Sequence, residues 1–336
     1  MRKEIFAIFD SETAYTSRLL DFVYKKYGDF FDIQAFTSVN KFCEFVAENN
    51  VELLLIAAQE MSDTIEKIQK IQIGKIILLS EGDIIPELAK YQTVYKYQAG
   101  ASMLAEVMEH YALKAVETPP LLLKQKMRIF GVYSPISRVL KTSFALTLGQ
   151  ILAKNSATLY LNLESFSGFE TLTNQMFSSD FADVMYFQRR GVGNLIYKVQ
   201  GLVQNLGQLD YLPPFFSPED LISIRAEEWL ELLQTLEEQS IYENIILDMG
   251  EGFDGLFKLL EKCGMIYMPI RDDVLSQAKL QQYKRLLEVK ELTEIMEKTR
   301  QIKLPFHSSF GSGEQYLEQL LWGELGDYVR ELLCEE

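Results

Sequence analysis

The sequence predicts an α/β protein of two domains, each built on a mainly parallel sheet. In the first third of the chain, short apolar segments alternate with segments of helical periodicity. In the remainder, several apolar segments of strand length end in polar residues and are separated by helical segments. Two adjacent prolines, Pro119 and Pro120, lie between these parts. We therefore expect domains at 1–114 and 126–336, joined by a linker at 115–125.

The first domain is expected to contain five strands that alternate with five helices. The predicted strands are 4–9, 31–36, 51–57, 75–79 and 93–97. The predicted helices are 14–26, 39–48, 62–70, 84–90 and 102–113. This alternation is typical of a flavodoxin-like, doubly wound sheet, which places functional residues at the carboxyl ends of its strands.

Polar residues at those strand ends resemble the site of a response-regulator receiver domain. The resemblance places Asp10 and Glu12 at the acidic positions, Ser80 at the hydroxyl position and Lys96 at the lysine position. No aspartate stands at the end of the third strand, where that family accepts the phosphoryl group, and Glu60 would reach the site differently. We therefore expect a pseudo-receiver used for docking, in which Asp10 and Lys96 are either an ion pair or solvated strand-end residues.

The second domain is expected to contain a parallel sheet of its own. Its predicted strands include 127–133, 157–164, 244–252 and 265–270. The first of them leads into a helix that starts near Lys141 and Thr142, and the last leads into a helix at 274–287. A ligand crevice is expected where these strands end.

The segment 131–143 has the context of a phosphate-binding loop without its glycines. In such a loop, glycines let backbone N–H groups curl around phosphates, a lysine reaches the phosphates, and a hydroxyl holds Mg²⁺. Here Lys141 and Thr142 stand at a helix N-terminus, where the helix dipole favours an anion. The strict GxxxxGK[ST] pattern is absent, so the segment alone is a weak signal.

Over residues 126–287, the chain resembles the deviant-Walker ATPases of the MinD/ParA type, and among them the TadZ/CpaE-like proteins of Flp/Tad-type pilus assembly. These proteins carry a receiver-like domain in front. Their KGGxGK[ST] motif aligns with residues 136–142. Its two lysines fall on Ile136 and Lys141, its three glycines on Ser137, Arg138 and Leu140, and its hydroxyl residue on Thr142. The acidic pair of the family's next strand falls on Asn162 and Glu164, and the Walker B aspartate falls on Asp248.

The resemblance implies a role for each matching residue. Nucleotide contacts are implied for Arg138, Lys141, Thr142 and Ser143. Thr142 and Asp248 would hold Mg²⁺, and Glu164 would orient the attacking water. The implied cofactors are ATP and Mg²⁺, or none if the site is only a relic in which Lys141 meets solvent and Asp248 is a turn residue.

The departures from the motif argue for weak chemistry. Ile136 cannot make the contact that the family's first lysine makes across a dimer. Arg138 and Leu140 bring side chains to positions where glycine allows a close backbone approach, although the Arg138 charge could replace part of the missing lysine. We expect ATP to bind weakly or not at all, and the chain to be at most a slow ATPase.

Composition excludes several other function classes. The 336 residues carry a net charge of −15, which disfavours free nucleic-acid binding because that affinity depends on a basic surface. The 3 cysteines are dispersed, and the 2 histidines, His110 and His307, lie far apart in sequence, so disulfides and histidine-based metal sites are disfavoured. Apolar runs are too short to span a bilayer, and we expect a cytoplasmic protein.

Two further segments bear on interactions. Residues 178–221 are rich in aromatic residues and proline, which predicts an ordered segment that is either core or an interface. Residues 314–333 form a helical apolar stripe whose polar face is mostly acidic. Acidic residues disfavour binding to anionic lipid, so we expect this helix to pack on the domain or on a partner.

Two functional interpretations remain. The first is a dimeric, TadZ/CpaE-like assembly or positioning protein of a pilus or secretion system, which reaches the cell pole or the inner membrane face only through partner proteins. The second is an active ATP-dependent dimerisation switch that uses Lys141, Thr142, Glu164 and Asp248. A transcriptional response regulator is disfavoured because the phosphoacceptor and a basic DNA-binding module are both missing from the sequence.

Overall fold

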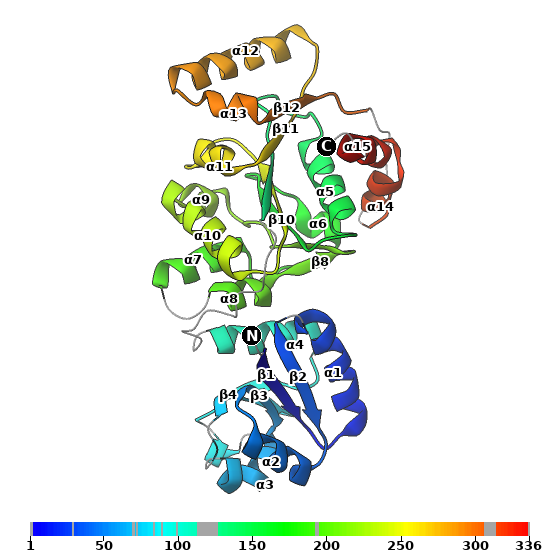
Figure 1. Cartoon of the computed structure of the whole chain (residues 1–336), viewed down its shortest axis with the longest axis vertical. Coiled ribbons are helices and arrows are strands. Elements are labelled where there is room, and N and C mark those ends of the chain that lie inside the picture. The colour runs from blue at the N-terminus through cyan, green and yellow to red at the C-terminus, as the bar shows by residue number, and fades with distance from the viewer. Residues whose placement is uncertain are drawn as a thin grey trace. The chain divides into compact units, whose positions relative to one another are not determined.

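The chain forms two compact units in a computed structural model (Figure 1). The structure describes residues 3–28, 30–68, 71, 73–82, 85–88, 90–98, 100–112, 127–191, 195–305 and 314–334. The first unit comprises Met1–Leu121 together with Val192–Gly201, and the second comprises Leu122–Gly191 together with Leu202–Glu336. The predicted linker at 115–125 lies outside the described residues.

The first unit is the predicted flavodoxin-like sheet. Its strands are β1 (Glu4–Phe9), β2 (Phe31–Phe36), β3 (Val51–Ala57), β4 (Ile73–Ser80) and β5 (Gln92–Tyr95). They pair in parallel in the order β2-β1-β3-β4-β5. The helical elements are α1 (Thr13–Tyr27), α2 (Val39–Glu48), α3 (Ala58–Ile68), η1 (Pro86–Leu88) and α4 (Gly100–Ala112).

Two helices of this unit differ from the prediction. The helix expected at 84–90 is a single 3₁₀ turn, η1, which starts at Pro86, a residue that lacks a backbone N–H. The helix expected from residue 62 begins at Ala58, directly after β3. The helix α3 therefore follows β3 without an intervening loop.

A short helix from the second half of the sequence completes the first unit. In α8 (Leu195–Leu202), the Tyr197 ring centroid lies 4.7 Å from that of Tyr111 and 5.9 Å from that of Phe31. The hydroxyls of Tyr111 and Tyr197 both donate to Oε2 of Glu4, at 3.2 and 3.3 Å. The chain therefore passes between the units more than once, which the sequence did not indicate.

The second unit contains a mainly parallel, seven-stranded sheet in the order β12-β11-β6-β10-β7-β9-β8. Its strands are β6 (Arg128–Val132), β7 (Thr158–Leu163), β8 (Gln204–Leu206), β9 (Leu209–Tyr211), β10 (Asn244–Met249), β11 (Met265–Pro269) and β12 (Thr299–Ile302). Only the β8–β9 pair among the described strands is antiparallel. The central strands β6, β10 and β7 are in register, so that Asp248 lies between Val132 and Asn162 at the carboxyl edge.

Helices cover both faces of this sheet. They are α5 (Lys141–Leu152), α6 (Phe169–Thr173), α7 (Phe181–Arg190), α9 (Pro218–Ile222), α10 (Ala226–Gln239), α11 (Leu256–Lys262), α12 (Val274–Val289), α13 (Thr293–Glu297), α14 (Glu314–Trp322) and α15 (Glu324–Cys334). The helix α5 is apolar on nearly all sides, and residues 143–149 are buried throughout. Such a helix needs neighbours on more than one face.

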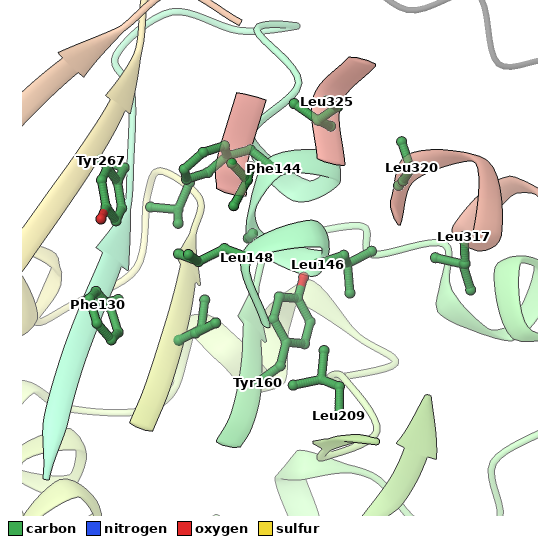
Figure 2. Packing of buried hydrophobic residues seen from close by; sticks show 14 of the residues in the cluster. Phe130, Phe144, Leu146, Leu148, Tyr160, Leu209, Tyr267, Leu317, Leu320 and Leu325 are labelled. Atoms are coloured by element: carbon green, nitrogen blue, oxygen red, sulfur yellow. The ribbon is translucent and has the colours of Figure 1, made fainter. Parts of the chain in front are cut away.

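The C-terminal helices supply the outer neighbours of α5. Figure 2 shows Phe144 and Leu148 of α5 in one core cluster with Leu320 and Leu325 of α14 and α15. The predicted apolar stripe at the C-terminus therefore packs on the second unit, as two helices and not one. Within the described part of the chain, no helix combines the length and apolarity needed to cross a membrane.

Candidate functional site

A buried lysine stands at the carboxyl edge of the first sheet. Nζ of Lys96, which follows β5, lies 2.8 Å from Oδ2 of Asp10, 3.0 Å from Oε2 of Glu12 and 3.1 Å from Oε1 of Glu81. The Lys96 side chain is only 3% exposed, and Asp10 is equally buried. The structure therefore joins the ends of β1, β4 and β5 through one cation and three carboxylates.

The charge on Lys96 is secured by these partners. Burial acts to lower the pKa of Lys96, but hydrogen bonds to Asp10, Glu12 and Glu81 outweigh burial and raise it. The Tyr15 ring centroid lies 4.7 Å from Nζ, and burial raises the pKa of Tyr15 to about 12. Lys96 is therefore protonated and Tyr15 neutral at physiological pH.

Three of the four predicted receiver residues form this ion-pair cluster, and the fourth is Ser80 at the end of β4. Asp10, Glu12 and Lys96 form the cluster, whereas Oγ of Ser80 accepts a hydrogen bond from Gly82 N at 3.0 Å. Glu81, which sequence reasoning missed, takes the third place around Lys96. An acidic residue directly after the hydroxyl residue that ends β4 was the available signal.

Two residues of the loop from β6 to α5 have left-handed backbone angles although neither is a glycine. Arg138 and Leu140 have φ angles of 59° and 62°, in the left-handed region. Both positions align with family glycines, and a non-glycine residue there costs about 1–2 kcal/mol. Ile136, at the position of the family's first lysine, is buried. The loop is therefore strained at Arg138 and Leu140.

Lys141, the first residue of α5, is folded back onto the sheet edge. Its Nζ lies 2.7 Å from Oε1 of Glu164, just after β7, and donates to the Met249 carbonyl oxygen at 2.6 Å. The first hydrogen bond of α5 runs from Phe144 N to Leu140 O, so the N–H groups of residues 141–143 remain free of helix partners. These backbone N–H groups are thus available to a ligand, whereas the Lys141 charge is already paired with Glu164.

Asp248 is the most deeply buried polar residue of the site. It is 0% exposed, and its Oδ2 accepts hydrogen bonds from the Tyr160 hydroxyl at 2.8 Å and from Asn162 Nδ2 at 3.3 Å. Burial raises the pKa of Asp248 to about 6, although Lys141, Thr142 and Tyr160 act to lower it. Sequence reasoning missed Tyr160, which shares a strand face with Asn162 because the two lie two residues apart.

The predicted nucleotide residues divide into two groups. Lys141, Thr142, Glu164 and Asp248 surround one point at the ends of β7 and β10. The Arg138 side chain is exposed, and the Ser143 hydroxyl lies 2.8 Å from the Tyr316 hydroxyl of α14. Ser143 thus faces the C-terminal helices.

The Lys96 cluster yields a stability prediction. Lys96→Met should lower the free energy of unfolding by about 3–5 kcal/mol, because it leaves Asp10 buried without a cation. Chemical denaturation at pH 7 measures this loss. Adding Asp10→Asn to Lys96→Met should recover most of it, and a single variant as stable as wild type would contradict the cluster.

Asp248 yields a prediction with a defined pH dependence. Its ordinary pKa is 3.8, so between about pH 4 and 6 the folded chain holds a proton that the unfolded chain releases, and stability falls as pH rises. Asp248→Asn removes this cost and should stabilise the protein by up to about 3 kcal/mol at pH 7. The advantage should vanish below about pH 4 in denaturation measurements. A variant less stable than wild type at pH 7 would refute the assignment.

Comparison with known proteins agrees with both units. Residues 1–112 match a family model described as TadZ-like, receiver domain. No curated protein matches the chain. A ParA family ATPase from Chlorobium tepidum TLS is 17% identical with a TM-score of 0.51, and the match spans 63% of this chain and 100% of that chain.

Two further solved structures match with TM-scores below 0.5. MinD of Pyrococcus horikoshii OT3, complexed with Mg-ADP, is 12% identical over 58% of this chain and 77% of its own, with a TM-score of 0.42. The MinC:MinD cell division complex of Aquifex aeolicus is 15% identical over 54% and 69%, with a TM-score of 0.40. The fold assignment therefore relies on the Chlorobium protein. The expected order of folds is confirmed: residues 1–112 match the TadZ-like receiver model, and the second unit shares the fold of the ParA family ATPase.

Proposed function

We propose that this protein is a non-catalytic assembly and positioning component of a Flp/Tad-type pilus or a related secretion system. It would act in the cytoplasm as a homodimer and reach the cell pole or the inner membrane face through partner proteins. The TadZ-like receiver domain supports the link to this machinery. The observation that carries the non-catalytic part is the internal pairing of Lys141 with Glu164 and the Met249 carbonyl oxygen.

The residues present do not fit Mg-ATP in this arrangement. Lys141 would have to leave two partners, at 2.7 and 2.6 Å, to reach a phosphate. Asp248 is covered by Tyr160 and Asn162, so a hydrated Mg²⁺ would have to displace these partners to reach its Oδ2. Ile136 is buried and cannot reach another subunit. We therefore derive no catalytic step through a nucleotide.

The first unit supports the same interpretation. Aspartyl phosphotransfer needs a carboxylate at the end of β3, where this chain has Ala57 and Ala58. Lys96, which would otherwise meet a phosphoryl group, is already surrounded by three carboxylates. In both candidate sites, a lysine is thus neutralised by carboxylates of the chain, Lys96 in the first unit and Lys141 in the second.

An ATP-dependent dimerisation switch remains the second candidate. Lys141, Thr142, Glu164 and Asp248 surround one point, as nucleotide chemistry would require. In such a switch, nucleotide would have to displace the carboxylate of Glu164 from Lys141.

Calorimetric titration with millimolar Mg-ATP separates the two candidates. The scaffold predicts no binding heat for wild type or for Lys141→Ala. Lys154→Ala, two residues after the last residue of α5, is the matched control. Binding that is lost in Lys141→Ala but kept in Lys154→Ala, with phosphate release, would overturn the scaffold and favour the switch.

A further inference from the structure

A groove in the second unit lies next to the strand that ends at the candidate nucleotide site. It has a volume of about 580 Å³ and begins at Phe166, two residues after Glu164. We call it the α6–α7 groove; it is lined by residues 166–171, 176–180, 183 and 214–216. These belong to α6, to the start of α7 and to the loops that precede them and follow β9.

The rim of the α6–α7 groove is apolar and highly exposed. Phe166, Met176 and Phe216 are 85%, 86% and 81% exposed, and they come from three separate segments. Phe169 and Phe215 lie buried beneath them. Large apolar side chains that converge around a hollow are typical of an interaction site, whereas scattered single ones are not.

Hydrogen bonds fix the three segments of the groove. Phe177 N donates to Oε1 of Glu170 at 3.1 Å, and Phe216 N donates to Oδ2 of Asp180 at 2.8 Å. Asp180 also caps α7 in a reciprocal arrangement with Asp183. The exposed rim is therefore held in place by the backbone, and an incoming group would meet a preformed surface.

The charge of the groove selects its occupant. Glu170, Asp180 and Asp183 line it, and none of its described lining residues is Lys or Arg. A second copy of this surface would bring three carboxylates against three carboxylates, which disfavours a symmetric contact through it. A basic segment with apolar side chains would instead match both the rim and the charge.

We propose that the α6–α7 groove binds a protein segment in which apolar side chains are flanked by Lys or Arg. The apolar side chains of the bound segment would lie among Phe166, Met176 and Phe216 of the groove. The Lys or Arg side chains of the segment would lie near Glu170 and Asp183. The groove proposal rests on the proposed scaffolding function, because the groove would be the surface through which a scaffold holds a partner. The test of the groove uses no nucleotide, so the groove proposal and the proposed function can fail separately.

The test uses the full-length protein and two fluorescent model peptides of equal length, one of Leu and Lys and one of Leu and Glu. Fluorescence anisotropy should show binding of the Leu/Lys peptide and no binding of the Leu/Glu peptide. The triple variant Phe166→Ser, Met176→Ser and Phe216→Ser should weaken binding about tenfold or more. Glu170→Gln keeps a hydrogen-bond acceptor for Phe177 N and should weaken binding less, with a smaller dependence on salt.

Val274→Ser with Leu275→Ser is the matched control, because these side chains of α12 are 84% and 76% exposed and lie outside the groove. This variant should bind like wild type, and circular dichroism should show every variant folded. Equal binding by the groove and control variants would overturn the proposal, as would no binding of the Leu/Lys peptide. Self-association of wild type that the triple serine variant loses would identify a second copy as the occupant and overturn it too.

Discussion

Lys141 holds together three elements at the carboxyl edge of the second sheet. Its ammonium group joins the start of α5 to Glu164 after β7 and to Met249 at the end of β10. In a phosphate-binding loop, an anionic ligand would neutralise such a lysine beside the helix N-terminus. Here a carboxylate of the chain does so. The positive charge of Lys141 is thereby neutralised within the chain, and Asp248 is fully buried next to it.

The fold tolerates the lost glycines because packing elsewhere determines the position of α5. Phe144 and Leu148 anchor that helix between the sheet and the C-terminal helices. The connection from β6 must then curl in a fixed way, and Arg138 and Leu140 adopt left-handed backbone angles to make it. Strain of this kind persists only where the surrounding structure over-determines it. Packing of α5 in the core therefore accounts for the strained angles of this loop.

The sequence predicted the strands well because strands depend on local patterns, and the roles predicted for the site lysines stay predictions. Buried strands read as apolar segments, and Lys96 and Lys141 follow directly from strand and helix boundaries. Prediction from the sequence failed where contacts between residues far apart in the chain determine how an element packs. The packing of α8 in the first unit depends on Tyr197 meeting Phe31 and Tyr111, which no local pattern reveals.

The partners of the site residues were similarly hidden. Tyr160 lies in the interior of β7, opposite Ile246, and the sequence gives no sign that its hydroxyl reaches Asp248. Glu81 reads as a turn residue until Lys96 is seen to reach it. Both residues lie two positions or fewer from a predicted site residue. The pairings that close the two sites thus became visible only with side-chain geometry.

We propose that the carboxylate of Glu164 takes the place of a phosphate at Lys141. Hydrogen–deuterium exchange of residues 133–143, with and without millimolar Mg-ATP, tests it most directly, because the N–H groups of residues 141–143 have no partner within α5 and bound phosphate would protect them. The account predicts the same exchange in both conditions. Slower exchange confined to this segment when Mg-ATP is present would contradict it.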